Sequence, residues 1–167
     1  MLKRFISRAI FLSSALFLAP LANAGKEDFK LPIEIGSNTQ FVDGKLKTSV
    51  FKDDVQVRQG TLSIDADELR IDAAAGQGKE VYTALGSPAV YSQTMDDGGQ
   101  ITAKANEIRY VVENRTLELR GNAELIQDAS MVKGEKISFN LEKEQLIAGG
   151  DEQKGRVTTV FQTEDID

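Results

Sequence analysis

Carboxylates are the side chains of this sequence that could carry out chemistry. Asp65 and Asp67 stand on either side of Ala66, and Glu68 with Glu107 offers a second pair of acids. Two carboxylates can hydrolyse a glycosidic bond when the pKa of one of them is raised by burial. Alternate residues of a strand share one face, so Asp65 and Asp67 are expected on a polar, solvated face. We therefore interpret these acids as surface residues and predict that the chain is not an enzyme.

Oxygen ligands that a hard cation could use occur in two further segments. These are Asp53-Asp54 and Asp96-Asp97-Gly98-Gly99. Calcium-binding loops and calcium-binding β-repeats place their oxygen ligands at regular intervals, and neither segment has such spacing. We interpret both segments as turns, and we predict no metal site and no cofactor.

The composition excludes most other kinds of site. The 167 residues include no His, no Cys and no Trp, so a Ser-His-Asp triad, a Cys-His pair and any metal site built on His or Cys are impossible. With 20 basic and 26 acidic residues, the net charge is −6, whereas nucleic-acid binding needs a basic surface. We therefore predict no nucleic-acid partner and expect a binding or structural role.

The first residues, 1–24, have the pattern of a cleavable secretory signal peptide. Three basic residues precede an uncharged apolar run from Ala9 to Leu21, and Ala22-Asn23-Ala24 is a small-x-small cleavage site. The apolar run is shorter than the roughly 20 residues of a membrane-spanning helix. The sequence predicts export to the periplasm and one mature domain, residues 25–167.

The mature chain reads as strands throughout, because apolar and polar residues alternate and a helical period is never sustained. Four segments resemble one another, and each has a small residue at its centre: Ser37, Ala66, Ala105 or Gly134. A small residue suits a corner at which a strand passes from one sheet direction to another. The pattern predicts an all-β architecture of repeated hairpin units, stacked into an elongated body.

The first and last strands of such a stack keep unpaired backbone groups. The last run, Arg156 to Phe161, is rich in β-branched residues and contains no Pro, and the first run continues from Pro32 into Ile33-Glu34-Ile35. Edges that pair so readily favour end-to-end assembly by strand addition.

Several short motifs, in this order and at this spacing, resemble the OstA-like family over nearly all of the mature chain. They are Pro32-Ile33-x-Ile35-x-Ser37-Asn38, Gln77-Gly78-Lys79-Glu80-Val81, Pro88-Ala89-x-Tyr91, Lys133-Gly134-x-Lys136-Ile137 and Arg156-Val157-Thr158-Thr159-Val160. The resemblance implies an elongated, V-shaped, partly open antiparallel β-jelly roll.

The resemblance also implies a role and partners. Such proteins bind lipopolysaccharide through its lipid A part and join head to tail. The resulting bridge runs from an inner-membrane lipopolysaccharide-export complex, met through its periplasmic bitopic subunit, to an outer-membrane lipopolysaccharide translocon. By the same resemblance, the edge around Ile33–Phe41 faces the inner membrane and the edge around Arg156–Phe161 faces the next subunit or the translocon. The alternative is a non-catalytic structural or carbohydrate-binding periplasmic β-scaffold, which shares the fold but lacks an apolar groove.

Alternation selects the side chains that face inward, where lipid and core share one face. We expect the lipid-binding groove to be lined by Ile33, Ile35, Val55, Val57, Ile64, Tyr91, Tyr110, Val112, Leu125 and Phe139. We expect the head-to-tail interface to include Ile33, Ile35, Phe41, Val157, Thr159 and Phe161.

Overall fold

A computed structural model describes residues 27–150 and 155–161. The predicted signal peptide, residues 1–24, lies outside the described residues. Two single-turn 3₁₀ helices accompany ten strands. The elements are η1 (Asp28–Lys30), β1 (Glu34–Gly36), β2 (Thr39–Asp43), β3 (Thr48–Gln59), β4 (Leu62–Asp72), β5 (Val81–Thr94), β6 (Gln100–Val111), η2 (Val112–Asn114), β7 (Thr116–Gln127), β8 (Ser130–Asn140), β9 (Gln145–Gly149) and β10 (Thr158–Phe161).

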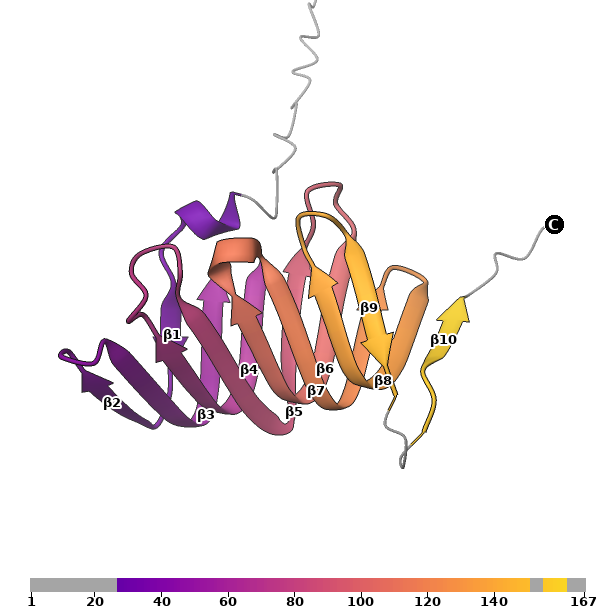
Figure 1. The fold of residues 1–167 in the computed structure, drawn as a ribbon. Coiled ribbons are helices and arrows are strands. Elements are labelled where there is room, and N and C mark those ends of the chain that lie inside the picture. Colours follow the sequence, from indigo (N-terminus) through magenta and orange to yellow (C-terminus); the bar gives the residue numbers. More distant parts are fainter. Residues whose placement is uncertain (1–26, 151–154, 162–167) are drawn as a thin grey trace, which may run out of the picture.

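All ten strands belong to one antiparallel sheet, which follows the order β1-β3-β4-β5-β6-β7-β8-β10. β2 also pairs with β3, and β9 also pairs with β8, so each outer edge consists of two short strands beside one long strand. The long strands stack along one axis and bend on one side of the stack, and η1 lies on the opposite side (Figure 1). We call this opposite side the mouth, because the two cavities lined by Phe29 lie there. The predicted all-β, unclosed antiparallel fold is confirmed. Within the described part of the chain, no helix is long and apolar enough to cross a membrane.

The bends come from extra residues on every second long strand. The register between strands shifts at residues 53–54 of β3, 86–88 of β5 and 121–122 of β7, which is the signature of β-bulges. Asp53 and Asp54 have φ angles of 63° and 53°, and Gly121 and Asn122 have 75° and 51°. The Asp53-Asp54 pair is therefore the corner of β3.

The partner strands carry a small residue beside each bulge, as the sequence predicts. Ala66 pairs with Val55, Ala105 with Ala89, and Gly134 with Ala123. Ser37 lies between β1 and β2, at the break that divides the first edge. The small side chains leave room on the concave side of each corner, so the sheet can fold into two arms that face each other.

Candidate functional site

One inward row of side chains runs across the whole sheet on one arm. The antiparallel register joins its members from the first edge to the last: Ile35, Val57, Ile64, Tyr91, Ala103, Leu125, Val132 and Thr159. Five of the ten groove residues predicted from alternation stand on this row, and so does the predicted interface residue Thr159. The row is apolar over its whole buried length.

The opposite arm carries two further inward rows. The row nearer the mouth contains Ile71, Tyr82, Tyr110, Leu117, Phe139 and Leu146. The row nearer the corner contains Phe51, Leu69, Ala84, Ile108, Leu119, Ile137 and Ala148. The predicted set includes Tyr110 and Phe139 from the row nearer the mouth. It misses the corner row, although Leu119 and Ile137 follow the alternation of their strands.

The predicted groove residues divide into a closed core and an open part. Val55, Tyr91, Leu125 and Phe139 are buried among other core side chains and line neither of the two cavities at the mouth. Ile33, Val57, Ile64, Tyr110 and Val112 line a cavity of about 270 Å³, whereas Ile35 is partly buried and packs against the core. The cavity exceeds the roughly 150 Å³ that admits a benzene molecule in an engineered core.

Phe29, Leu62 and Tyr82 line the same cavity and are absent from the predicted set. Leu62 lies on β4 and Tyr82 on β5, and the alternation of apolar and polar residues in these strands could have identified both as inward-facing. Phe29 precedes every predicted strand, so alternation gives no sign of its position. A smaller and more polar cavity of about 160 Å³ lies beyond Phe29. Its walls combine Met95 and Leu141 with the polar side chains Gln93, Asp96, Arg115, Glu142 and Glu144.

Aromatic rings gather around Tyr110 at the mouth. The Tyr110 ring centroid lies 5.9 Å from that of Phe29, 6.4 Å from that of Tyr91 and 6.5 Å from that of Tyr82. Burial raises the pKa of the Tyr91 hydroxyl well above its usual range and also raises the pKa values of Tyr82 and Tyr110. The tyrosines therefore favour their neutral forms in the folded protein.

These shifts predict a cooperative alkaline transition. Because the folded pKa values exceed the unfolded value of about 10, the stabilisation is fully present below pH 10 and is lost as the pH rises toward the folded values. The three tyrosines are the only Tyr residues and there is no Trp, so phenolate absorbance reports them alone. We expect that absorbance to rise together with the loss of β-sheet circular dichroism. Ionisation of all three near pH 10 with the sheet intact would contradict this.

The outer face of the sheet carries ladders of ion pairs. Glu68 meets Lys52 at 3.3 Å and also pairs with Arg70, and the Arg70 hydrogen bond is the main cause that lowers the pKa of Glu68. Arg109 donates to Glu118 at 3.0 Å. Exposed pairs of this kind contribute little to stability, and they keep this face polar.

The carboxylates considered for catalysis belong to this outer face. Asp65 pairs with Arg58 at 2.8 Å, Glu107 lies 3.9 Å from Arg120, and Asp67 is exposed. Asp96–Gly99 forms the turn between β5 and β6, in which the Asp97 carboxylate accepts from the Gly99 amide at 2.9 Å. Among residues 27–150 and 155–161, no group of acidic residues could hold a metal ion.

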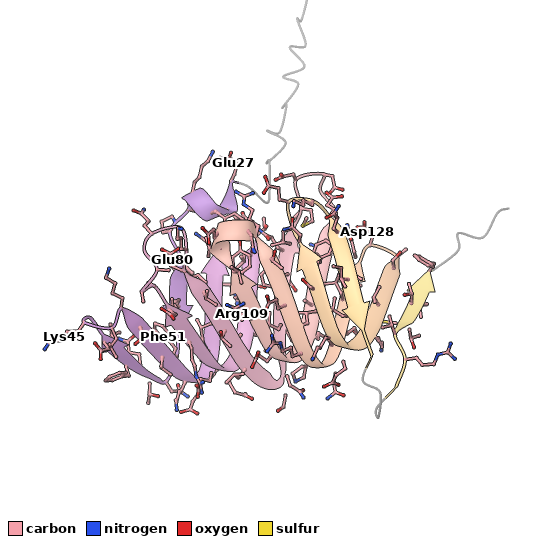
Figure 2. All side chains as sticks on the ribbon, viewed as in Figure 1. Glu27, Lys45, Phe51, Glu80, Arg109 and Asp128 are labelled. Atoms are coloured by element: carbon pink, nitrogen blue, oxygen red, sulfur yellow. The ribbon has the colours of Figure 1, made fainter. Side chains whose placement is uncertain are left out.

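Large exposed apolar side chains gather at the two ends of the stack. At the first end they are Leu31, Ile33, Phe41, Val42 and Leu46. At the last end they are Leu146, Ile147, Val157, Val160 and Phe161. Figure 2 shows Lys45, the neighbour of Leu46, at the outermost point of the first end. Phe41 is 64% exposed and Phe161 72% exposed. Of the other predicted interface residues, Ile33 and Val157 belong to the same two exposed groups, whereas Ile35 on β1 packs against the core and Thr159 lies on β10.

Comparison with known proteins gives a family match and close relatives. Residues 34–145 match the family model described as "LptA/(LptD N-terminal domain) LPS transport protein". The chain is 35% identical over 162 residues to the lipopolysaccharide export system protein LptA of Haemophilus influenzae, covering 96% of this chain and 94% of that protein. It is 36% identical to LptA of Escherichia coli, covering 93% of this chain and 85% of that protein.

A solved structure has the same architecture. It is LptH of Pseudomonas aeruginosa, described as the LptA-homologous periplasmic component of the lipopolysaccharide transport device. The TM-score is 0.74 at 26% sequence identity, and the alignment covers 81% of this chain and 99% of that one.

Proposed function

Because the chain belongs to the family of LptA/(LptD N-terminal domain) LPS transport proteins, we propose that it binds lipopolysaccharide by its acyl chains and passes it along the inward rows of the bent sheet. The family assignment agrees with the OstA-like resemblance of the sequence. It also agrees with the prediction that the chain is not an enzyme, because the relatives are export proteins.

The apolar inward rows carry this proposal. Exposing acyl chains to water costs about 0.8 kcal/mol per CH₂ group, so a lipid with several chains needs a continuous apolar surface to cross an aqueous space. The row supplies apolar side chains from Ile35 at the first edge to Val132 on β8. The cavity beside Ile64 and Tyr110 supplies an opening at the mouth.

The chain has no sequence motif for energy coupling. The nearest candidate, Gly76-x-Gly78-Lys79, lacks the spacing of a P-loop and its following Ser or Thr. We propose that lipid moves passively through this protein and that partners upstream supply the driving force.

The edges support a head-to-tail assembly in the periplasm, after export directed by residues 1–24. Each edge combines unpaired strand backbone with exposed apolar side chains, which suits β-strand addition. We propose that β1 and β2 meet the inner-membrane export complex or the preceding copy. We propose that β9 and β10 meet the next copy or the outer-membrane translocon, so that the inward rows of successive molecules join.

Photocrosslinking with purified components tests lipid binding. A photoreactive residue at Tyr110, whose ring lines the cavity, is expected to form an adduct with lipopolysaccharide, whereas the same residue at exposed Asp67 is not. Circular dichroism checks that both variants fold. Equal adducts at the two positions, or none at either, would contradict the proposal, and a complete absence would favour the β-scaffold alternative.

A further inference from the structure

The turn η1 lies across the mouth between the two arms, directly before the first strand. Figure 2 shows Glu27, the residue before this turn, above the mouth. Asp28 is only 3% exposed, which is exceptional for a carboxylate. Its carboxylate accepts hydrogen bonds from the Thr61 amide at 2.9 Å and from Gln93 Nε2 at 3.0 Å, and also from the Thr61 hydroxyl. The turn is thus fixed to the arm that carries the β3–β4 hairpin.

Gly60 leaves the space that the Asp28 carboxylate occupies. A Cβ atom at Gly60 would lie 2.0 Å from Asp28 Oδ1, and the Gly60 φ angle is +61°. Any other residue at position 60 would place its Cβ atom where the Asp28 carboxylate lies, so this contact requires glycine in the hairpin.

Phe29 extends from the same turn into the mouth. One side of its ring stacks on Tyr110 at 5.9 Å, and the Arg115 guanidinium lies 5.2 Å from the ring centroid. The ring lines both the 270 Å³ cavity and the 160 Å³ cavity. Phe29 therefore divides what would otherwise be a longer cleft along the mouth.

Resting on the function proposed above, we propose that η1 is a displaceable plug, whose Phe29 ring occupies the place that an acyl chain takes beside Tyr110 when lipid is bound. An aromatic ring and a run of methylene groups are alternative fillings of the same apolar space. Departure of the ring joins the two cavities into one cleft that follows the direction of the inward rows.

The attachment of the turn suits movement. Its backbone–backbone hydrogen bonds, Lys30 N to Glu27 O and Leu31 N to Asp28 O, stay within the turn. Side chains hold it to the arms, and Gln59 Nε2 donates to the Leu31 carbonyl at 2.9 Å. After the predicted cleavage at Ala24, the only covalent connection from the turn to a strand runs through Leu31, so once its side-chain contacts break the turn can move out without disturbing a strand.

The Tyr110 hydroxyl offers a bound lipid a hydrogen bond in addition to the apolar contacts. This oxygen is buried and has no hydrogen-bond partner among the described residues. A buried hydroxyl without a partner is unfavourable, and Phe29 offers none. The ester, amide or hydroxyl oxygens of an acylated lipid can pair with it after Phe29 leaves.

A tryptophan at position 29 reports the movement directly, since the chain has no other Trp. For Phe29→Trp, we expect the indole emission to shift to longer wavelength when lipopolysaccharide is added, as the ring passes from the mouth into water. Radiolabelled lipopolysaccharide retained by the same immobilised variant measures binding separately. Binding without a shift to longer wavelength would overturn the plug, whereas no binding by any variant would overturn the proposed function itself.

A disulfide tests whether the plug must move. The Thr61 hydroxyl donates to the Asp28 carboxylate at 2.5 Å, so Asp28→Cys with Thr61→Cys is the pair that can tie the turn to the hairpin, and mass spectrometry of the oxidised protein establishes that the disulfide has formed. If the plug competes with lipid, the oxidised form is expected to retain at least about fivefold less lipopolysaccharide than the same protein after reduction.

A matched pair on the outer face controls for oxidation. Ser92 and Thr102 face each other across β5 and β6 with their hydroxyls 3.3 Å apart. Ser92→Cys with Thr102→Cys is expected to retain the same amount of lipopolysaccharide in both redox states. Equal retention by the oxidised and reduced forms of the Asp28–Thr61 pair, with the disulfide verified by mass spectrometry, would overturn the plug.

Discussion

Phe41→Asp and Phe161→Asp are each expected to make the protein monomeric, whereas an equimolar mixture of the two variants forms a dimer that does not grow. Phe41 belongs to β2 at one edge and Phe161 to β10 at the other, and both rings are largely exposed. Covering such a ring contributes about 1.5–3 kcal/mol, and a carboxylate buried there without a partner costs more. A loss of about 3 kcal/mol weakens association more than a hundredfold.

The mixing experiment distinguishes a head-to-tail contact from a symmetric contact between like edges. A heterologous contact needs one edge of each kind, and the two variants together supply one intact edge of each kind. Thr83→Asp, which adds the same charge on the outer face of β5 far from both edges, is the matched control and is expected to assemble like the unaltered chain. Dimers formed by either variant alone, measured by sedimentation, would show that like edges pair and would contradict the proposal.

The second large effect is expected at the corner of β5. A Cβ atom at Gly86 would lie 2.6 Å from the backbone nitrogen of Ala89 and 2.9 Å from its Cα. Ala89 is completely buried and pairs with Ala105 on β6, so the backbone cannot move away without disturbing the core. We expect Gly86→Ala to lower the free energy of unfolding by about 2–3 kcal/mol, measured by urea denaturation.

Gly44→Ala is the matched control for this change. A Cβ atom at Gly44 has no neighbour within 4 Å, so the same substitution is expected to change stability by less than about 0.5 kcal/mol. Equal effects at Gly44 and Gly86 would mean that the bend of β5 does not depend on close packing at its corner.

Alternation made most of the fold predictable, because a strand that has one buried face must repeat its apolar residues with period two. That period identified Ile35, Val57, Ile64, Tyr91 and Leu125 of the inward row, whereas Ala103 and Val132 were not identified. The corners were also visible, since a bend that brings backbones close requires small residues such as Ala66 and Ala105. The alternation and the small corner residues are both local features, so both can be read from one sequence without an alignment.

The parts that were not predicted depend on contacts between distant segments. Phe29 reaches Tyr110 only after the whole stack has formed, and no periodicity marks a three-residue turn. Strand β9, which completes the last edge beside β8, was not singled out either. Alternation also cannot tell a filled core position such as Leu125 from one that borders a cavity such as Ile64, because that difference depends on how far the arms separate.

The most direct test is photocrosslinking in intact cells at the two ends of one inward row. Ile35 and Thr159 end the row that crosses the sheet, while Glu34 and Val160 are their strand neighbours, whose side chains alternate to the other face. The account predicts lipopolysaccharide adducts at Ile35 and Thr159 and none at Glu34 and Val160. Adducts on the outward neighbours but not on the inward pair, in a folded and exported protein, would contradict transport along the inner face.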